Sequence, residues 1–358
     1  MSKSNSFIKN LKNINHSINS LLERNLNKLK FNNLINLARS NKIVLTVVAL
    51  IMSSICYLLI PNFYKQADIL KELNSELSNK LNLDFKFTKN LKYNVFPRPH
   101  FISDELVILY DKSEISKIKK TKIYISLENL FSLEQIKINQ VILENANFNL
   151  NNQNFDFFIK LLENKFNNLD LNIINSNIFF RDTQNEVLFI NKILKMKYYY
   201  DPKIFQSILS SENKIFNVPY NLELFKDKYQ KRILSKVNFK FLKLQIENEF
   251  NFSNEVKNGK SDLLFNKSKS IIDYKLDKKE FSFSFYDKLE NPKFSYKGMF
   301  NLNPFFSSFE GKTQELNSIF LFNTMAFIPQ ILKTEILNNK NIEFESSINA
   351  KKFSNNLN

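Results

Sequence analysis

The chain is poor in the residues that build most catalytic and metal sites. Its 358 residues include three glycines, two histidines and one cysteine, and tryptophan is absent. Gly259, Gly298 and Gly311 are too widely spaced to form a G-x-G-x-x-G turn, a phosphate-binding loop or a G-x-S-x-G elbow. The usual nucleotide-dependent enzymes are therefore excluded, and we expect neither enzymatic activity nor a cofactor.

Cysteine and histidine are too scarce for a metal centre. Cys56 has no second cysteine with which to form an intramolecular disulfide or a thiolate cluster. His16 and His100 lie on either side of a candidate membrane span, so we expect them to face different compartments. A His-rich metal site is thereby excluded and a Ser-His-Asp triad is not expected. We predict that His100, which follows Pro97-Arg98-Pro99, is a loop residue.

One long apolar run is present, from residue 43 to 60, and it contains 18 residues without a charge. A helix of that length is about 27 Å long, close to the ~30 Å hydrocarbon core of a bilayer. It predicts one transmembrane helix, which Pro61 can end. The residues expected to anchor the chain in lipid are Ile43, Val44, Leu45, Val47, Val48, Leu50, Ile51, Ile55, Leu58, Leu59 and Ile60.

The charges around this run predict its orientation. The 42 preceding residues carry eight lysines and arginines against one acid, Glu23, whereas residues 61–80 carry three lysines. Because basic residues are retained in the cytoplasm, we expect the amino terminus inside and the remainder outside. A cleaved signal peptide is the alternative, but the preceding segment is too long and no small-x-small site follows. We thus expect a single-pass protein of the bacterial inner membrane, with its bulk in the periplasm.

The formal charge of +16 could suggest nucleic-acid binding. Beyond the membrane, however, lysines alternate with Asn, Glu and Ser, which is typical of a solvated face, and export removes most nucleic acid from reach. Nucleic acid is therefore not an expected partner. Residues 1–42 place apolar side chains at helical spacing and predict a basic tail that is either an amphipathic helix on the membrane surface or disordered.

After the span, residues 62–82 predict a juxtamembrane amphipathic helix, because Ile69, Leu73, Leu77 and Leu81 recur every four residues. Residues 83–310 then change to a period of two, which indicates a β-rich domain of short half-buried strands. A short helix is predicted near 154–166. The order of strands and turns predicts a meander, and hence an antiparallel sheet.

The end of the chain adds two elements. Residues 311–340 have apolar residues at helical spacing but are too polar for a second span, so they predict an amphipathic helix. Residues 341–358 alternate again and predict the start of a further strand. Because an open strand edge is an aggregation hazard, the sequence could be part of a longer chain.

Periodicity alone favours a closed β-sandwich or barrel, because alternating aromatic strands usually form a core. The order of parts nevertheless resembles the AsmA-like family of envelope proteins. The resemblance runs through DILKELNSELSNKLN, KNLKYNVFPRPHFISDELVI, IYISLENLFSLEQIKINQVILENANFNL, NKIFNVPYNLELF, YKGMFNLNPF and LKTEILNNKNIEF, and covers most of residues 43–350.

This resemblance implies a curved antiparallel sheet whose apolar groove carries phospholipid between membranes. It also implies a role in cell-envelope biogenesis, with an alternative role in assembling outer-membrane β-barrel proteins. The expected partners are the inner-membrane bilayer, phospholipid and envelope-assembly proteins. The residues that would line the groove are Val237, Phe239, Phe241, Ile246, Phe250, Phe252, Ile272, Tyr274, Leu276, Phe281, Phe283, Phe285, Phe294, Tyr296 and Phe300.

Overall fold

A computed structural model gives the fold of the chain. It describes residues 42–81, 83–88, 91–110, 113–128, 130–151, 154, 169–182, 184–227, 232–251, 257–265, 268–277, 280–287, 294–302, 305–317 and 342–354. The chain divides into two compact units, Met1–Ile60 and Pro61–Asn358. The predicted cytoplasmic tail lies almost wholly outside the described residues.

The described part of the first unit is the helix α3, Lys42–Leu59. A 19-residue stretch, Leu45–Phe63, is long and apolar enough to cross a membrane, and it is the only such stretch in the described residues. The hydroxyls of Thr46 and Ser54 donate to carbonyls four residues earlier, at 2.9 and 2.8 Å. Their polar groups are thus satisfied within the helix, as an apolar surrounding requires.

The second unit begins with two short helical elements. The 3-10 turn η1, Ile60–Phe63, contains Pro61 and ends the apolar helix as the sequence predicts. The helix α4, Gln66–Leu81, follows and buries Ile69, Leu73, Leu77 and Leu81 along one side. An amphipathic helix is therefore present within the predicted range, although it begins at Gln66 rather than at residue 62.

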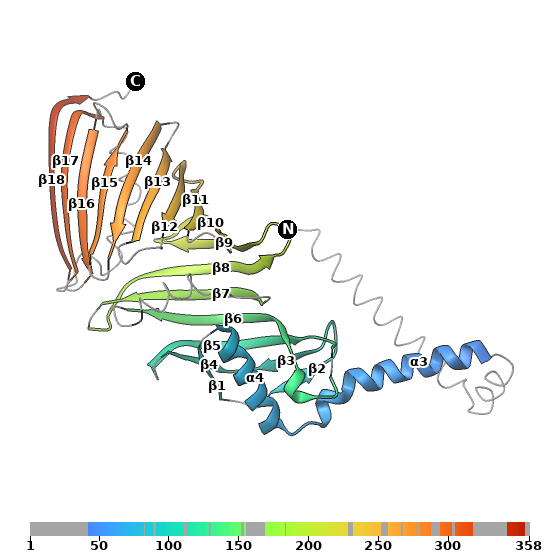
Figure 1. Cartoon of the computed structure of the whole chain (residues 1–358). Coiled ribbons are helices and arrows are strands. Elements are labelled where there is room, and N and C mark those ends of the chain that lie inside the picture. Colours follow the sequence, from blue (N-terminus) through green and yellow to red (C-terminus); the bar gives the residue numbers. More distant parts are fainter. Residues whose placement is uncertain are drawn as a thin grey trace, which may run out of the picture. The chain divides into compact units, whose positions relative to one another are not determined.

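The remainder of the described chain is a single sheet of 18 strands, shown in order in Figure 1. A second 3-10 turn, η2 (Leu133–Gln135), lies between β5 and β6. The strands are β1 (Asp84–Phe87), β2 (Lys92–Asn94), β3 (His100–Ser103), β4 (Leu106–Tyr110), β5 (Ser113–Ile125), β6 (Ile138–Leu150), β7 (Asp170–Arg181), β8 (Val187–Asp201), β9 (Gln206–Ile215), β10 (Val218–Asp227), β11 (Arg232–Phe239), β12 (Leu244–Asn251), β13 (Lys257–Phe265), β14 (Ser268–Leu276), β15 (Glu280–Tyr286), β16 (Phe294–Leu302), β17 (Phe305–Asn317) and β18 (Ile342–Ser354).

The first four strands make up two adjacent rows of the sheet, and each row is broken into two short strands. β3 and β4 both pair with β5, and β2 and β1 pair with the outer side of β3 and β4. His100 is the first residue of β3 and is buried, with its ring stacked on Tyr124 at 4.8 Å. The prediction that His100 is a loop residue was therefore wrong, because strand pairing places it beside an aromatic neighbour.

From β7 to β17 the strands form an uninterrupted antiparallel meander. The pairs β6–β7 and β17–β18 are parallel, which corrects the prediction of a wholly antiparallel sheet. A parallel pair needs a long connection that returns the chain to the starting end. The predicted helix 154–166 falls in the first of these connections and, except for Asn154, lies outside the described residues.

The end of the chain also differs from the prediction. Residues 311–317 belong to β17 rather than to a helix, because their backbone continues the ladder with β18, as in the pairs Glu315–Lys352 and Leu316–Phe353. Residues 318–340 of the predicted helix lie outside the described residues. The predicted further strand is confirmed as β18.

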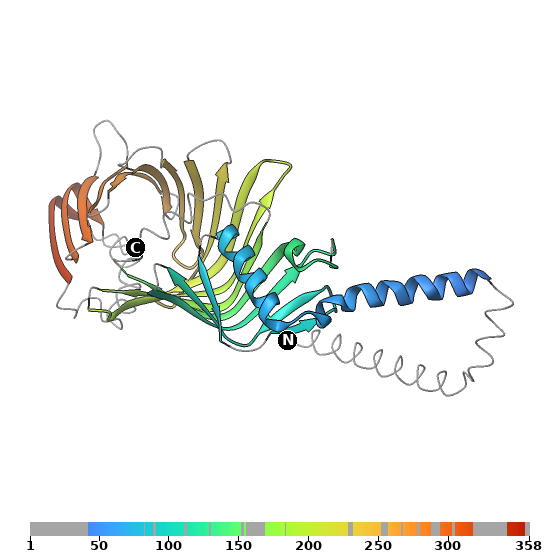
Figure 2. The same ribbon diagram turned by 60° about the horizontal axis from the view of Figure 1, so that its bottom comes forward.

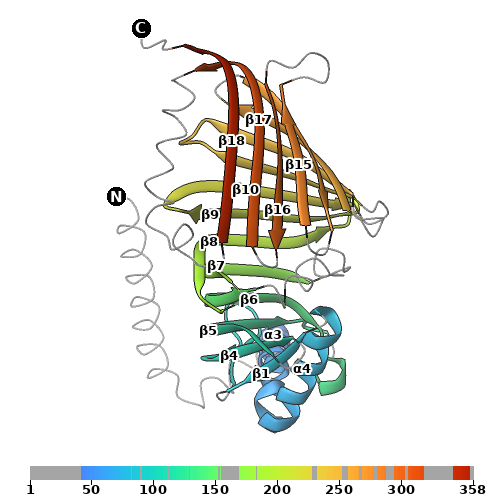
Figure 3. The same ribbon diagram turned by 90° about the vertical axis from the view of Figure 1, so that its left-hand side faces the viewer.

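The sheet is open rather than closed. Within the described residues, β18 pairs with β17, β1 with β4 and β2 with β3, and all strands belong to one sheet, so neither a barrel nor a two-sheet sandwich is formed. Figure 3 shows the strands one after another from β1 to β18, and Figure 2 shows the later strands curling over. A right-handed twist between neighbours accounts for such curling in a large sheet.

Candidate functional site

One face of the sheet is largely apolar, with an interruption at β9, where the register places Ser211 and Asn213 opposite Leu222 and Tyr220. Residues opposite each other in a ladder share a face, and the register places Val237 opposite Ile246 and Ile246 opposite Leu263. Further along, Tyr274 lies opposite Phe283, and other aromatic pairs follow in β15 and β16. We call this side, which carries Val237, Ile246, Leu263, Tyr274 and Phe283, the apolar face.

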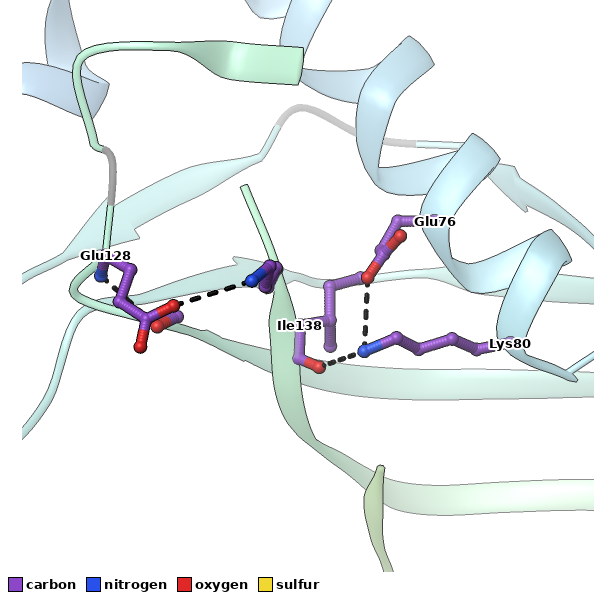
Figure 4. Close-up of polar contacts among 6 residues, drawn as sticks. Glu76, Lys80, Glu128 and Ile138 are labelled. Atoms are coloured by element: carbon purple, nitrogen blue, oxygen red, sulfur yellow. Dashed lines mark hydrogen bonds and ion pairs between the residues drawn. The ribbon is translucent and has the colours of Figure 1, made fainter. Parts of the chain in front are cut away.

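The first strands of the apolar face are covered by α4. α4 packs against β1, η2 and β6. In the same part of the sheet, five residues of this face are at most 1% exposed: Phe101, Leu106, Ile118, Ile123 and Ile138. The Lys80 ammonium donates to the Ile138 carbonyl at 2.6 Å and pairs with Glu76 at 3.1 Å, which fixes the end of α4 over β6 (Figure 4). This part is an ordinary hydrophobic core.

The later strands of the apolar face are only partly covered. From β11 onward its large apolar side chains in the described residues are half-buried, and Ile233 is the buried exception. Rings contact one another along this stretch: Tyr220 and Phe239 stack at 4.9 Å, and Phe283 and Phe300 stack at 5.8 Å. A filled core would bury these rings, so this stretch is an aromatic surface that remains accessible.

All three glycines of the chain lie on this face, each opposite an aromatic residue. Gly259 faces Tyr274, and a methyl group added there would lie 2.0 Å from the Tyr274 ring. Gly298 likewise faces Phe283, at 2.3 Å, and Gly311 is covered by a third ring. The rings therefore lie across the neighbouring strand instead of standing upright, an arrangement that glycine permits and any other residue obstructs. The rings therefore project little from the apolar face.

A short polar line crosses the apolar face. The Tyr274 hydroxyl passes over Gly259 and donates to the Asn248 side-chain oxygen at 2.7 Å, which also accepts from Ser261 at 2.8 Å. The Asn248 amide donates to Ser235 at 3.3 Å. Burial raises the pKa of Tyr274, so the phenol remains a neutral donor. These groups satisfy one another and leave no charge among the rings.

The opposite face is predominantly polar, although it also carries apolar residues such as Leu234 and Leu264. Ion pairs join neighbouring strands there, Lys236 with Glu247 at 3.0 Å and Lys269 with Asp262 at 2.9 Å. Both pairs are largely exposed, so they contribute roughly 0–1 kcal/mol each. Their main effect is solubility of that face, and the sheet is consequently amphipathic.

Twelve of the fifteen predicted lining residues share the apolar face: Val237, Phe239, Ile246, Phe250, Ile272, Tyr274, Leu276, Phe281, Phe283, Phe285, Tyr296 and Phe300. Phe294 occupies the same set of register positions, opposite Thr313. Phe241 does not line the face. It lies in the turn after β11, 69% exposed, because the chain reverses at residues 240–243. Phe252 lies outside the described residues.

Sequence reasoning also missed part of the face. Leu222 and Leu224 of β10, Leu244 of β12 and Phe309 of β17 all share it. The alternation around Leu222 and Leu224 would have predicted β10. Phe309 was missed because no strand was predicted between Phe300 and the helix expected from residue 311, although these residues were assigned to the β-rich domain.

The described residues contain no cluster of three or more His, Cys, Asp or Glu side chains in a metal-binding arrangement. The buried His100 places Nδ1 2.7 Å from the Arg98 carbonyl oxygen, and Arg98 lies over the Tyr124 ring at 4.8 Å. These contacts hold the β2–β3 turn against the core.

Comparisons of the chain with protein-family models and with curated proteins found no match.

Proposed function

We propose that this protein is a membrane-anchored lipid-binding module of the bacterial envelope, of the AsmA-like type, which takes up phospholipid acyl chains along the apolar face. The observation that carries this proposal is the change in burial along one continuous face. α4 covers the first strands, whereas the aromatic stretch from β11 to β17 remains half-exposed. Large exposed apolar patches on soluble surfaces are uncommon and mark binding sites.

The dimensions suit acyl chains. The seven strands from β11 to β17 are separated by six spacings of about 4.8 Å, which gives about 29 Å along the sheet. One leaflet contributes about half of a ~30 Å hydrocarbon core, so this stretch can accommodate the chains of at least one phospholipid. The glycine-backed rings leave the surface low enough for a chain to lie along it.

The energetics favour transfer rather than permanent capture. Moving a chain from water to an apolar surface gains about 0.8 kcal/mol for each CH₂ group, which keeps the lipid out of the aqueous phase. Moving it from a bilayer to this face exchanges one apolar surrounding for another and is nearly balanced. The face would therefore act passively, and the proposal assigns no catalytic step to any residue.

The proposed location is the bacterial inner membrane. α3 would cross the bilayer once, with the basic residues before it in the cytoplasm and the sheet in the periplasm. The role that follows is a contribution to lipid transport and envelope biogenesis. We further propose that the curved sheet forms the groove in which the lipid lies.

The test replaces Phe283 by aspartate in the full-length protein. A carboxylate in the middle of the apolar face would need to stay hydrated and would oppose the seating of an acyl chain. The protein is purified in a mild detergent, and co-purifying phospholipid is quantified by mass spectrometry. We expect lipid with the parent chain and a marked loss with Phe283→Asp.

The matched control is Ser282→Asp, which places the same charge on the same strand but on the polar face, opposite Lys275. It should retain parental lipid. Equal lipid in all three proteins, or equal loss in both variants, would overturn the proposal, because the lipid would then not depend on the apolar face.

A second candidate is an interaction protein that assists outer-membrane β-barrel assembly. It is favoured by one observation: in the described residues the outer edge of β18, a 13-residue strand, pairs with no other strand. An exposed edge can add a client strand. Photocrosslinking of unfolded outer-membrane proteins to β18, with lipid absent from the purified chain, would support this candidate over the first.

A further inference from the structure

Four large apolar side chains at the start of the second unit are strongly exposed. Phe63 is 84% exposed, Phe96 88%, Leu127 54% and Phe131 74%. Phe63 lies in η1, Phe96 in the β2–β3 turn, and Leu127 and Phe131 in the connection between β5 and β6. We call these four residues the proximal apolar patch.

Hydrogen bonds join the segments that carry this patch. The Tyr64 hydroxyl, next to Phe63, donates to the Leu130 carbonyl at 2.8 Å. The Ile125 amide donates to the Pro99 carbonyl at 3.2 Å, which holds the end of β5 beside the β2–β3 turn. The three segments therefore lie together at one end of the first strands. Hydrogen bonds to backbone carbonyls hold the segments that carry the aromatic residues.

Hydrogen bonds and an ion pair hold the described residues at the two ends of the connection that carries Leu127 and Phe131. The Ser126 amide donates to the Lys137 carbonyl at 2.8 Å, and the Ser126 hydroxyl accepts from the Glu128 amide at 3.2 Å. Glu128 and Lys137 form an ion pair at 3.5 Å, seen beside the Lys80 contact in Figure 4. Internal contacts thus hold the loop while its apolar side chains project outward.

We propose that the proximal apolar patch inserts into the surface of the bilayer that anchors the chain and seats the sheet on that membrane. The inference rests on the proposed membrane anchor. Phe63 follows the apolar run by three residues, so it lies within about 10 Å of the end of that run. The interfacial region of a bilayer is about 5–7 Å deep on each side, and aromatic residues favour it. The bilayer is therefore the occupant that chain continuity brings to this patch.

The absence of tryptophan allows a direct test. Phe131→Trp and Leu127→Trp each place a single indole in the patch, and Leu264→Trp places one on the polar face of β13, where the native residue is 43% exposed. Each full-length variant is reconstituted into phosphatidylethanolamine–phosphatidylglycerol vesicles, with and without lipids brominated near the headgroup. Fluorescence is then compared between the two vesicle preparations.

We expect the two patch tryptophans to be blue-shifted and to lose fluorescence in brominated vesicles, whereas the Leu264→Trp indole stays unquenched. Patch tryptophans that are not quenched, or quenching of all three variants alike, would overturn the inference. Flotation of the vesicles reports the anchor separately: protein that floats while its patch is unquenched retains the anchor and refutes only the seating. Lipid loss in Phe283→Asp is a further, independent readout of the lipid-binding proposal.

Discussion

Gly259→Ala should disrupt the polar line that crosses the apolar face. A methyl group at this position would lie 2.0 Å from Tyr274 Cζ and 2.2 Å from its hydroxyl oxygen, so the ring must move away. The movement breaks the hydrogen bond to Asn248, worth about 0.5–1.5 kcal/mol. It also separates the ring from the surface of β13. Alanine is roughly 0.5–1 kcal/mol more favourable than glycine within a strand. This gain would nearly cancel the cost of the lost hydrogen bond, so a net loss of stability requires that the ring is also displaced.

The assay is hydrogen exchange of the full-length protein in lipid nanodiscs, followed by mass spectrometry of peptides from β13 and β14. A local loss of about 1–2 kcal/mol corresponds to roughly 5–30-fold faster exchange. Tyr274→Phe removes the hydrogen bond and keeps the ring, so it should accelerate exchange less. Because Gly259→Ala already breaks that bond, the double variant should exchange no faster than Gly259→Ala alone.

Lys260→Ala is the control, since Lys260 is exposed on the polar face of the same strand, opposite Asp273. It should leave the exchange of β13 and β14 close to that of the parent. The role of Gly259 in supporting the ring would be refuted if Gly259→Ala left hydrogen exchange unchanged, or if the effects of Gly259→Ala and Tyr274→Phe on exchange were additive. Either result would show that Gly259 is not needed for the Tyr274 ring to lie across β13.

Three further outcomes follow from the structure. Leu77→Ala empties a fully buried site under α4 and should cost about 2–5 kcal/mol, detected as faster exchange of α4, whereas the exposed Lys71→Ala should not change it. Burial raises the pKa of the Tyr93 phenol from 10.0 to about 12, so the folded state binds the phenolic proton more tightly than the unfolded state does. The free energy of unfolding, followed by circular dichroism, should therefore fall as the pH rises from 10 to 12, and it should fall less steeply in Tyr93→Phe. Lys236→Ala should change stability by no more than about 1 kcal/mol in urea titrations, because its ion pair is exposed; a larger loss would show that the polar face contributes more than solubility.

Local sequence patterns predicted those elements whose environment is set by one face. The four-residue spacing of Ile69, Leu73 and Leu77 predicted α4, and the alternation of Phe281, Phe283 and Phe285 predicted β15 with its apolar side. In α4 one side is buried and the other is wet, so periodicity records burial directly. In β15 both sides are half-buried over most of the strand, so the alternation records only which face carries the rings. The apolar run of α3 was predictable from its length alone, because 18 consecutive residues carry no charge.

Pairing partners were not predictable from such patterns. The helix predicted near 154–166 is compatible with a parallel crossover between β6 and β7, but the alternation of the two strands does not distinguish a parallel from an antiparallel pair. Glu315 and Leu316 follow a helical spacing, yet the ladder with β18 places them in a strand, as tertiary pairing outweighs weak local propensity. Phe241 alternates with Phe239 and still leaves the face, because a turn begins at residue 240.

The candidate site was predictable in outline and not in its fine structure. Alternation placed most of the lining residues, but it gave no sign that Gly259, Gly298 and Gly311 each lie opposite a ring. That relation depends on register between strands. Burial along the face also depends on register and on where α4 packs, so the boundary between covered core and accessible surface emerged only from the fold.

Site-specific photocrosslinking tests the central claim most directly. A photoreactive phenylalanine analogue is placed at Phe283 on the apolar face or at Ser282 on the polar face of the same strand, in the full-length protein in native membranes. The protein is irradiated, purified and analysed by mass spectrometry for covalent phospholipid. The account predicts a phospholipid adduct from position 283 and none from position 282. Adducts at neither position, or equally at both, would contradict it.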